Sequence, residues 1–204
     1  MNDKEVALMS RGMHIDIAVD LMGLTYDNRV GIFSYRVAPI QVNFLGYPGT
    51  MGAEYFDYII ADKVVVPEAI KEEYAEKIIY LPGCYLPHDR GQKISDRAYS
   101  RQECGLPSDG FVFCCFNAAF KLTPKLFDSW MRILQSTEKS VLWLSAQNDS
   151  VVANLRMEAE TRGVDSSRLI FAQRTPLMED HLARHKLADL FLDTLPYNAH
   201  TTAL

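Results

Sequence analysis

The sequence predicts an α/β protein in two parts, and three observations support that class. Apolar runs of strand length recur along all 204 residues. In the second half these runs alternate with segments of helical periodicity, the pattern of a parallel α/β sheet. Between residues 82 and 101 a stretch rich in glycine, proline and charge resembles an interdomain connector. We therefore expect one domain over residues 1–103, connector included, and a second over residues 104–204.

The second half alternates regularly between strands and helices. Its expected strands are residues 111–116, 140–144, 169–172 and 188–192, and its expected helices are 124–135, 151–162 and 179–186. Thr123 is a suitable N-cap before Pro124, and Gly163 ends the second helix. Right-handed crossovers would place the loops that follow the strands on one rim, where ligands of such sheets bind.

The first half is less regular. Its expected strands are residues 15–19, 41–45, 58–61 and 77–81, with a short helix over residues 67–76. We expect no helix before the first strand. This start, together with a chain that stops where a last helix should begin, suggests an excerpt from a longer protein.

Composition excludes several classes of protein. The net charge of -5 gives no basic field for nucleic acid or an anionic membrane. No apolar run approaches the ~20 residues of a membrane helix, and the N-terminus lacks a signal-peptide pattern. The four cysteines show no CxxC spacing, so we expect reduced thiols and a cytoplasmic location.

The last seven residues carry the strongest functional signal. They follow the apolar run 187–193 through a turn containing Pro196 and Asn198, as a helix follows a parallel strand. Free amides and the helix dipole make such a point an anion site. His200, Thr201 and Thr202 would add side-chain donors. We interpret this segment as the pyrophosphate site of a sugar nucleotide, cut short by the chain end.

Two further sets of polar residues are candidates on the same rim. Asn117 and Lys121 occupy the loop after residues 111–116, where the lysine could reach a phosphate; a solvated surface lysine is the alternative. His181 and Arg184 share one helix face and suit a phosphate or ribose, or are simply exposed polar residues. His185 completes a possible zinc pair with His181, but no third ligand is evident, so we expect no metal and no cofactor.

A glycine-rich loop is the main feature of the first half. Leu45, Gly46, Tyr47, Pro48, Gly49 and Thr50 open it, and Gly52 closes it. Its backbone could approach another molecule closely. It matches neither a Walker motif nor GxGxxG, so a structural turn remains the alternative.

Taken in order, these segments resemble a known family over nearly the whole chain. Residues 14–21, 38–52 and 57–62 look like the N-terminal catalytic lobe of O-linked N-acetylglucosamine transferases. The C-terminal lobe is similar to residues 116–117 with Lys121, and to residues 140–144, 179–184 and 187–202. SPINDLY-type O-fucosyltransferases share the pattern.

The resemblance implies a GT-B fold: two Rossmann-like lobes with parallel sheets, the N-terminal one partial and the C-terminal one truncated. It implies inverting, metal-independent transfer of a sugar from a UDP-sugar to Ser or Thr of a protein acceptor. Lys121 would contact the β-phosphate. His200, Thr201, Thr202, Asn117, His181 and Arg184 would bind the donor, and the loop from Leu45 to Thr50 would face the sugar and acceptor. Tetratricopeptide repeats are expected in the full-length protein, and nucleic acid and membrane are not.

Two departures from the family pattern leave the donor open. Ala118 stands where a glutamine is common, and Phe120 where a tyrosine is common. Both changes remove polar groups near the donor. GDP-fucose is therefore an alternative donor, and a non-catalytic interaction module or a nucleotide sensor on the same fold are alternative functions. The general base is expected outside this chain.

Overall fold

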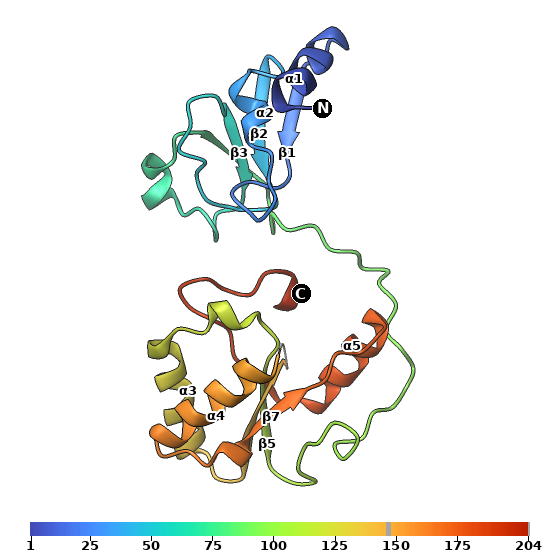
Figure 1. The fold of residues 1–204 in the computed structure, drawn as a ribbon, viewed down its shortest axis with the longest axis vertical. Helices are drawn as coiled ribbons and strands as arrows, with labels where there is room; N and C mark the ends of the chain where they lie inside the picture. The colour runs from blue at the N-terminus through green and yellow to red at the C-terminus, as the bar shows by residue number, and fades with distance from the viewer. Residues whose placement is uncertain (146–147, 204) are drawn as a thin grey trace. The chain divides into compact units, whose positions relative to one another are not determined.

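The computed structural model describes residues 1–145 and 148–203 and divides into two compact units (Figure 1). Unit 1 is Met1–Pro87 and unit 2 is His88–Leu204. Each unit holds one four-stranded sheet in which every paired strand is parallel. The predicted α/β class with two parallel sheets is confirmed.

Unit 1 contains all four strands expected of it. Its elements are α1 (Asp3–Gly12), β1 (Ile17–Asp20), α2 (Gly31–Ser34), β2 (Ile40–Phe44), β3 (Tyr58–Ala61), the 3-10 helix η1 (Glu68–Glu73) and β4 (Lys77–Tyr80). The strand order is β1-β2-β3-β4. The expected helix over residues 67–76 is instead a six-residue 3-10 helix.

The expectation that no helix precedes the first strand is wrong. Helix α1 begins with a capping box, in which Asn2 Oδ1 accepts from the Glu5 amide and Glu5 Oε2 accepts from the Asn2 amide, both at 2.9 Å. Asp3 also pairs with Arg29 at 2.6 Å. The spacing of Asn2 and Glu5 was the readable signal for this helix.

The strand order of unit 1 leaves its sheet covered unequally. Right-handed crossovers between strands that lie in chain order all fall on one face. The register places Gln41 and Ile59 on one face, where both side chains are fully buried. On the opposite face Ile17, Ile40 and Ile79 are 55%, 37% and 42% exposed.

Unit 2 follows the predicted alternation closely. Its elements are β5 (Phe111–Cys115), η2 (Ala119–Lys121), α3 (Pro124–Ser136), β6 (Ser140–Ser145), α4 (Asp149–Thr161), η3 (Ser166–Arg168), β7 (Leu169–Ala172), α5 (Met178–Arg184), η4 (His185–Leu187), β8 (Leu190–Phe191) and η5 (Thr201–Ala203). The strand order is β7-β6-β5-β8. Two expectations are corrected: β8 pairs over only two residues, and residues 201–203 form a 3-10 turn.

Local chemistry explains where these helices begin and end. Thr123 Oγ1 accepts from the Leu126 amide at 3.3 Å, with Pro124 at the first helical position of α3. Asn148 Oδ1 caps α4 through the Val151 amide at 2.9 Å. Gly163, at φ +73°, follows the end of α4 in the left-handed conformation that glycine tolerates best.

The connector packs on unit 2 along part of its length. The Ser95 amide donates to the Glu179 carbonyl at 3.1 Å, and Arg101 Nη1 donates to the Gly110 carbonyl at 2.7 Å. Arg101 also pairs with Asp189 at 3.3 Å. Through these contacts the connector meets the start of α5, the residue before β5 and the residue before β8.

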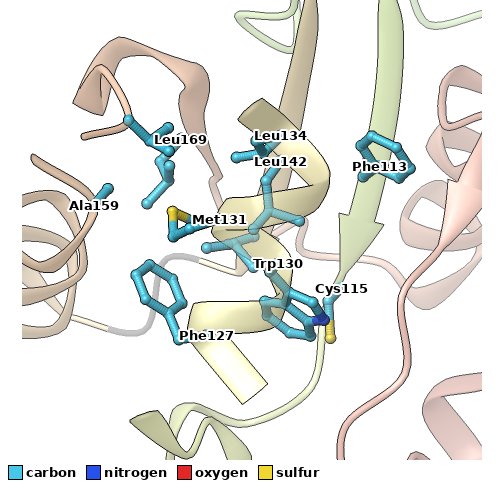
Figure 2. Packing of buried hydrophobic residues seen from close by; sticks show 11 residues of the cluster. Phe113, Cys115, Phe127, Trp130, Met131, Leu134, Leu142, Ala159 and Leu169 are labelled. Atoms are coloured by element: carbon cyan, nitrogen blue, oxygen red, sulfur yellow. The ribbon is translucent and has the colours of Figure 1, made fainter. Parts of the chain in front are cut away.

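The main core of unit 2 lies between its sheet and α3 and α4 (Figure 2). From α3, Trp130 and Met131 are buried to 3% and 1% exposure, and Leu142 of β6 is fully buried against them. Burial raises the pKa of Cys114 to about 12 and that of Cys115 to about 11, so both remain thiols at neutral pH. This packing makes the sheet a rigid support for its rim.

We expect Gly110→Ala to destabilise unit 2 by at least ~2 kcal/mol. Gly110 has φ +105°, and an added Cβ would lie 1.9 Å from the Lys139 carbonyl oxygen. Both tryptophans of the chain, Trp130 and Trp143, lie in unit 2, so fluorescence-monitored urea unfolding reports on it. Gly91→Ala is the control, because its Cβ would meet only the Asp89 carboxylate at 3.2 Å. Equal midpoints for both variants would contradict the steric argument.

Candidate functional site

Asn117 links the first rim loop of unit 2 to the last. It lies two residues after the end of β5 and is buried to 4% exposure. Its Nδ2 donates to Thr194 Oγ1 at 2.9 Å and lies 3.5 Å from Asp193 Oδ1. Thr194, which is fully buried, donates a hydrogen bond from its hydroxyl to the Tyr197 carbonyl at 2.7 Å. Asn117 therefore fixes the loop that carries the candidate phosphate residues.

Asp193 organises that last loop from within. Its Oδ1 accepts from the Thr194 amide at 2.7 Å and the Ala199 amide at 2.6 Å, and its Oδ2 accepts from Asn198 Nδ2 at 2.9 Å. Burial raises the pKa of Asp193, but these hydrogen bonds outweigh it and the pKa lies below its usual value. The carboxylate is thus ionised at neutral pH and closes the loop.

Lys121 lies against this loop. Its Nζ donates to the Asn198 carbonyl at 2.9 Å and sits 4.5 Å from the centre of the Tyr197 ring. The imidazole of His200 also stacks on that ring, at 5.3 Å and 16°. The structure therefore brings Lys121 and His200 to the same aromatic ring, which the sequence did not single out.

Lys121 and His200 are both partly removed from solvent, and this lowers the pKa of each. Burial lowers the pKa of Lys121, and the nearby Asp193 carboxylate works in the opposite direction. Burial also lowers the pKa of His200, and the charge of Lys121 lowers it further. His200 is therefore neutral at pH 7. Thr201 and Thr202 lie in the 3-10 turn that follows it.

His181 and Arg184 do not form an exposed helical surface, so that alternative is wrong. Arg184 is 7% exposed; its Nε and Nη2 lie 3.1 and 2.7 Å from His181 Nδ1, and its Nη1 donates to the Gln173 carbonyl at 2.5 Å. The guanidinium also lies 5.3 Å from the Phe116 ring and 5.7 Å from the Trp143 ring. These hydrogen bonds and ring contacts hold the Arg184 side chain in one position.

The arginine contacts also settle the tautomer of His181. Because Nδ1 accepts from Arg184, the proton of the neutral ring is on Nε2. Burial, His185 and Arg184 together lower the pKa of His181 to about 4, so the ring is uncharged at pH 7. His185 donates from Nδ1 to the His181 carbonyl at 2.7 Å. Among residues 1–145 and 148–203, no cluster of three His, Cys, Asp or Glu side chains offers a metal site.

A pocket of about 550 Å³ opens over this pair at the carboxyl ends of β5, β6 and β7. Phe116, His181 and Arg184 line it together with Ser145, Ala172 and residues 174–178. Its walls combine an aromatic ring, a neutral imidazole donor and a fixed cation. This combination suits a planar, polar group such as a nucleobase. A larger hollow of about 820 Å³ lies at the opposite strand ends, beside Lys139 and Arg168.

The glycine-rich loop of unit 1 is tightly held. A Cβ on Gly46 would lie 2.4 Å from the Leu21 carbonyl oxygen and 2.5 Å from that of Met22, so only glycine fits. Asn43 Nδ2 donates to the carbonyls of Gly49 and Tyr47 at 3.2 and 3.4 Å. The loop is an ordered surface, and its expected role facing the sugar and acceptor stays a prediction.

Within the described parts of the chain, no helix combines the length and apolar character that crossing a bilayer would require.

Comparison with known proteins gives consistent matches. The profile described as glycosyl transferase family 41 matches residues 4–98 and 90–204. The probable UDP-N-acetylglucosamine–peptide N-acetylglucosaminyltransferase SEC of Arabidopsis thaliana is 36% identical over 207 residues, which cover 99% of this chain and 21% of that protein. The similarly named SPINDLY of Eustoma exaltatum is 34% identical, covering 99% of this chain and 22% of that protein.

A solved structure agrees with these matches. A mutant O-GlcNAc transferase of Thermobaculum terrenum superposes with a TM-score of 0.88 at 30% identity, over 99% of this chain and 38% of that one. The match supports the expected GT-B fold class. The chain spans about a fifth of the length of the first two relatives, at 21% and 22%.

We expect His181→Gln to flatten the pH dependence of the stability of unit 2. The folded pKa of about 4 lies below the ordinary 6.5, so His181 stabilises the fold above pH 6.5 and this contribution is lost as pH falls toward 4. Between pH 7.5 and 5 the loss attributable to His181 should be about 2 kcal/mol. Urea unfolding followed by tryptophan fluorescence at both pH values measures it.

The matched control is His88→Gln, since His88 is exposed. If His181→Gln and His88→Gln lose equal stability between pH 7.5 and 5, the imidazole is not held in its neutral form.

Proposed function

Because this chain belongs to glycosyl transferase family 41, we propose that the full-length protein is a protein O-glycosyltransferase. It would transfer N-acetylglucosamine from a UDP-sugar to Ser or Thr hydroxyls of an acceptor protein. The observation that carries the proposal is the position of Lys121: its ammonium lies at the rim of a parallel sheet, against the loop that presents His200. Such rims are where sheets of this kind bind nucleotides.

Two sets of side chains in unit 2 would bind different parts of the donor. The pocket over His181 and Arg184 offers a neutral N–H donor, a fixed cation and the Phe116 ring, and would take the nucleoside. Lys121, His200, Thr201 and Thr202 would take the diphosphate, and Asn117 would hold their loop in place. An ammonium has three donors, and the Asn198 carbonyl accepts one of them, so Lys121 keeps capacity for a phosphate oxygen.

The proposed reaction is a single inverting displacement. The acceptor hydroxyl attacks the anomeric carbon on the side opposite the diphosphate, the glycosidic bond to the β-phosphate oxygen breaks, and the hydroxyl proton passes to a base outside this chain. Negative charge then grows on the leaving UDP. Lys121, partly desolvated, would stabilise that charge without a metal ion and without a cofactor.

The proposal extends to partners of the full-length protein. The loop from Leu45 to Thr50 would face the sugar and the acceptor, and the full-length protein would also contain tetratricopeptide repeats. The relatives named above act on peptides, according to their names. We propose a cytoplasmic site of action and no nucleic-acid partner.

Lys121→Ala should lower kcat by about 30- to 1,000-fold, which corresponds to ~2–4 kcal/mol of transition-state stabilisation. The reason is the loss of one preorganised cation at the leaving group. Steady-state transfer to a protein acceptor by the full-length enzyme measures the effect. Lys125→Ala removes an exposed lysine from the start of α3 and is the control. Normal turnover by the Lys121 variant would refute the assigned role.

Competition binding should identify the donor base. We expect UDP to displace a labelled UDP-sugar from the full-length protein at a concentration at least tenfold lower than GDP. The two nucleotides carry the same diphosphate, so the difference reports on the pocket over His181. The opposite preference would favour the GDP-fucose alternative, which the loss of polar groups at Ala118 and Phe120 leaves open.

A further inference from the structure

We propose that Glu76 is a positioning residue for transfer to the acceptor, because its carboxylate fixes the glycine-rich loop of unit 1. Glu76 lies just before β4 and is 4% exposed. Its Oε2 accepts from the Thr50 hydroxyl at 2.7 Å, and its Oε1 accepts from the Met51 amide at 2.6 Å. This inference rests on the proposed function, in which that loop faces the sugar and acceptor.

Thr50 is the centre of the hydrogen bonds that hold the loop, which we call the Glu76–Thr50 clamp. While its hydroxyl donates to Glu76, its Oγ1 accepts from the Ala75 amide at 3.2 Å and the Gly52 amide at 3.0 Å. One threonine oxygen thus ties the loop to the segment that enters β4, and it also closes the loop on itself. Because each oxygen of Glu76 accepts one hydrogen bond from the loop, the loop is fixed relative to the segment that enters β4.

Two further contacts hold the loop on either side of Thr50. Tyr74 donates its hydroxyl to the Pro48 carbonyl at 3.2 Å. Asn43, at the end of β2, donates to the carbonyls of Tyr47 and Gly49. A loop with glycines at positions 46, 49 and 52 has much conformational freedom to lose. These side chains remove that freedom in the fold, before any substrate binds.

The cost of the arrangement argues that position matters. Burying a carboxylate is unfavourable unless its oxygens are hydrogen-bonded, and a simple turn between β2 and β3 needs none. Groups that meet a transition state must be held within a fraction of an ångström, and small displacements lower rates strongly. A loop fixed by Glu76 meets that requirement. A loop without the Glu76–Thr50 clamp would sample other positions and would contribute less to the rate of transfer.

The test compares Glu76→Gln with Asp62→Asn in the full-length protein. Asp62 is a matched control because it too is buried in unit 1, at 3% exposure, and accepts backbone amides of Val64, Val65 and Tyr85 away from the loop. Glu76→Gln keeps the shape of the side chain, but it removes the negative charge and replaces one acceptor oxygen by an NH2 group. We expect kcat with a protein acceptor to fall about tenfold or more in Glu76→Gln, and to stay within twofold of wild type in Asp62→Asn.

Two further readouts separate positioning from general damage. Affinity for UDP should be unchanged in both variants, since the groups proposed to bind the nucleoside and the diphosphate lie in unit 2. Amide hydrogen exchange of residues 49–52 should be faster in Glu76→Gln alone. Thr50→Val should reproduce the loss in kcat, and the double variant should be no worse than either single one, because both break the same link.

The outcomes distinguish the two proposals. If wild type transfers sugar and Glu76→Gln matches it, or if Asp62→Asn loses as much kcat, the positioning role of Glu76 is refuted while the transferase stands. If wild type transfers no sugar to any Ser or Thr acceptor, the proposed function fails, and the role of Glu76 in it fails too.

Discussion

The candidate site of unit 2 depends on one carboxylate. Asp193 accepts hydrogen bonds from two backbone amides and from Asn198, and these bonds bend the chain so that His200 returns toward the rim. Asn117 and Thr194 anchor the same loop to the end of β5. Lys121 can then rest on the Asn198 carbonyl. An ionised carboxylate near the lysine also favours the ammonium form that desolvation disfavours.

The site combines charged and uncharged groups for different tasks. His181 is held neutral by burial and by two cationic or basic neighbours, and its ring presents a fixed N–H. Arg184 carries a positive charge and donates to His181 and to the Gln173 carbonyl. Lys121, by contrast, donates to the Asn198 carbonyl at the rim. In the proposed function, His181 and Arg184 would recognise the base, and Lys121 would meet the charge that develops during reaction.

Much of this arrangement could be predicted from the sequence, because periodicity and caps are local. The strands of both sheets, the caps at Thr123 and Gly163 and the rim position of Lys121 follow from such patterns. Asp193, Tyr197 and Glu76 could not be identified in this way. Their roles depend on contacts with residues that only the fold brings near. Helix α1 is a different case, since the Asn2–Glu5 capping box was readable and was overlooked.

The strand order of the sheet in unit 1, which leaves one face less covered than the other, has a consequence for handling the protein. Ile17, Ile40 and Ile79 are partly exposed on one face of the sheet of unit 1, whereas the opposite face buries Gln41 and Ile59 completely. Parallel sheets ordinarily have both sides covered. A surface of this kind lowers solubility and favours self-association as concentration rises. Purification of this region by itself therefore calls for mild detergent or low concentration.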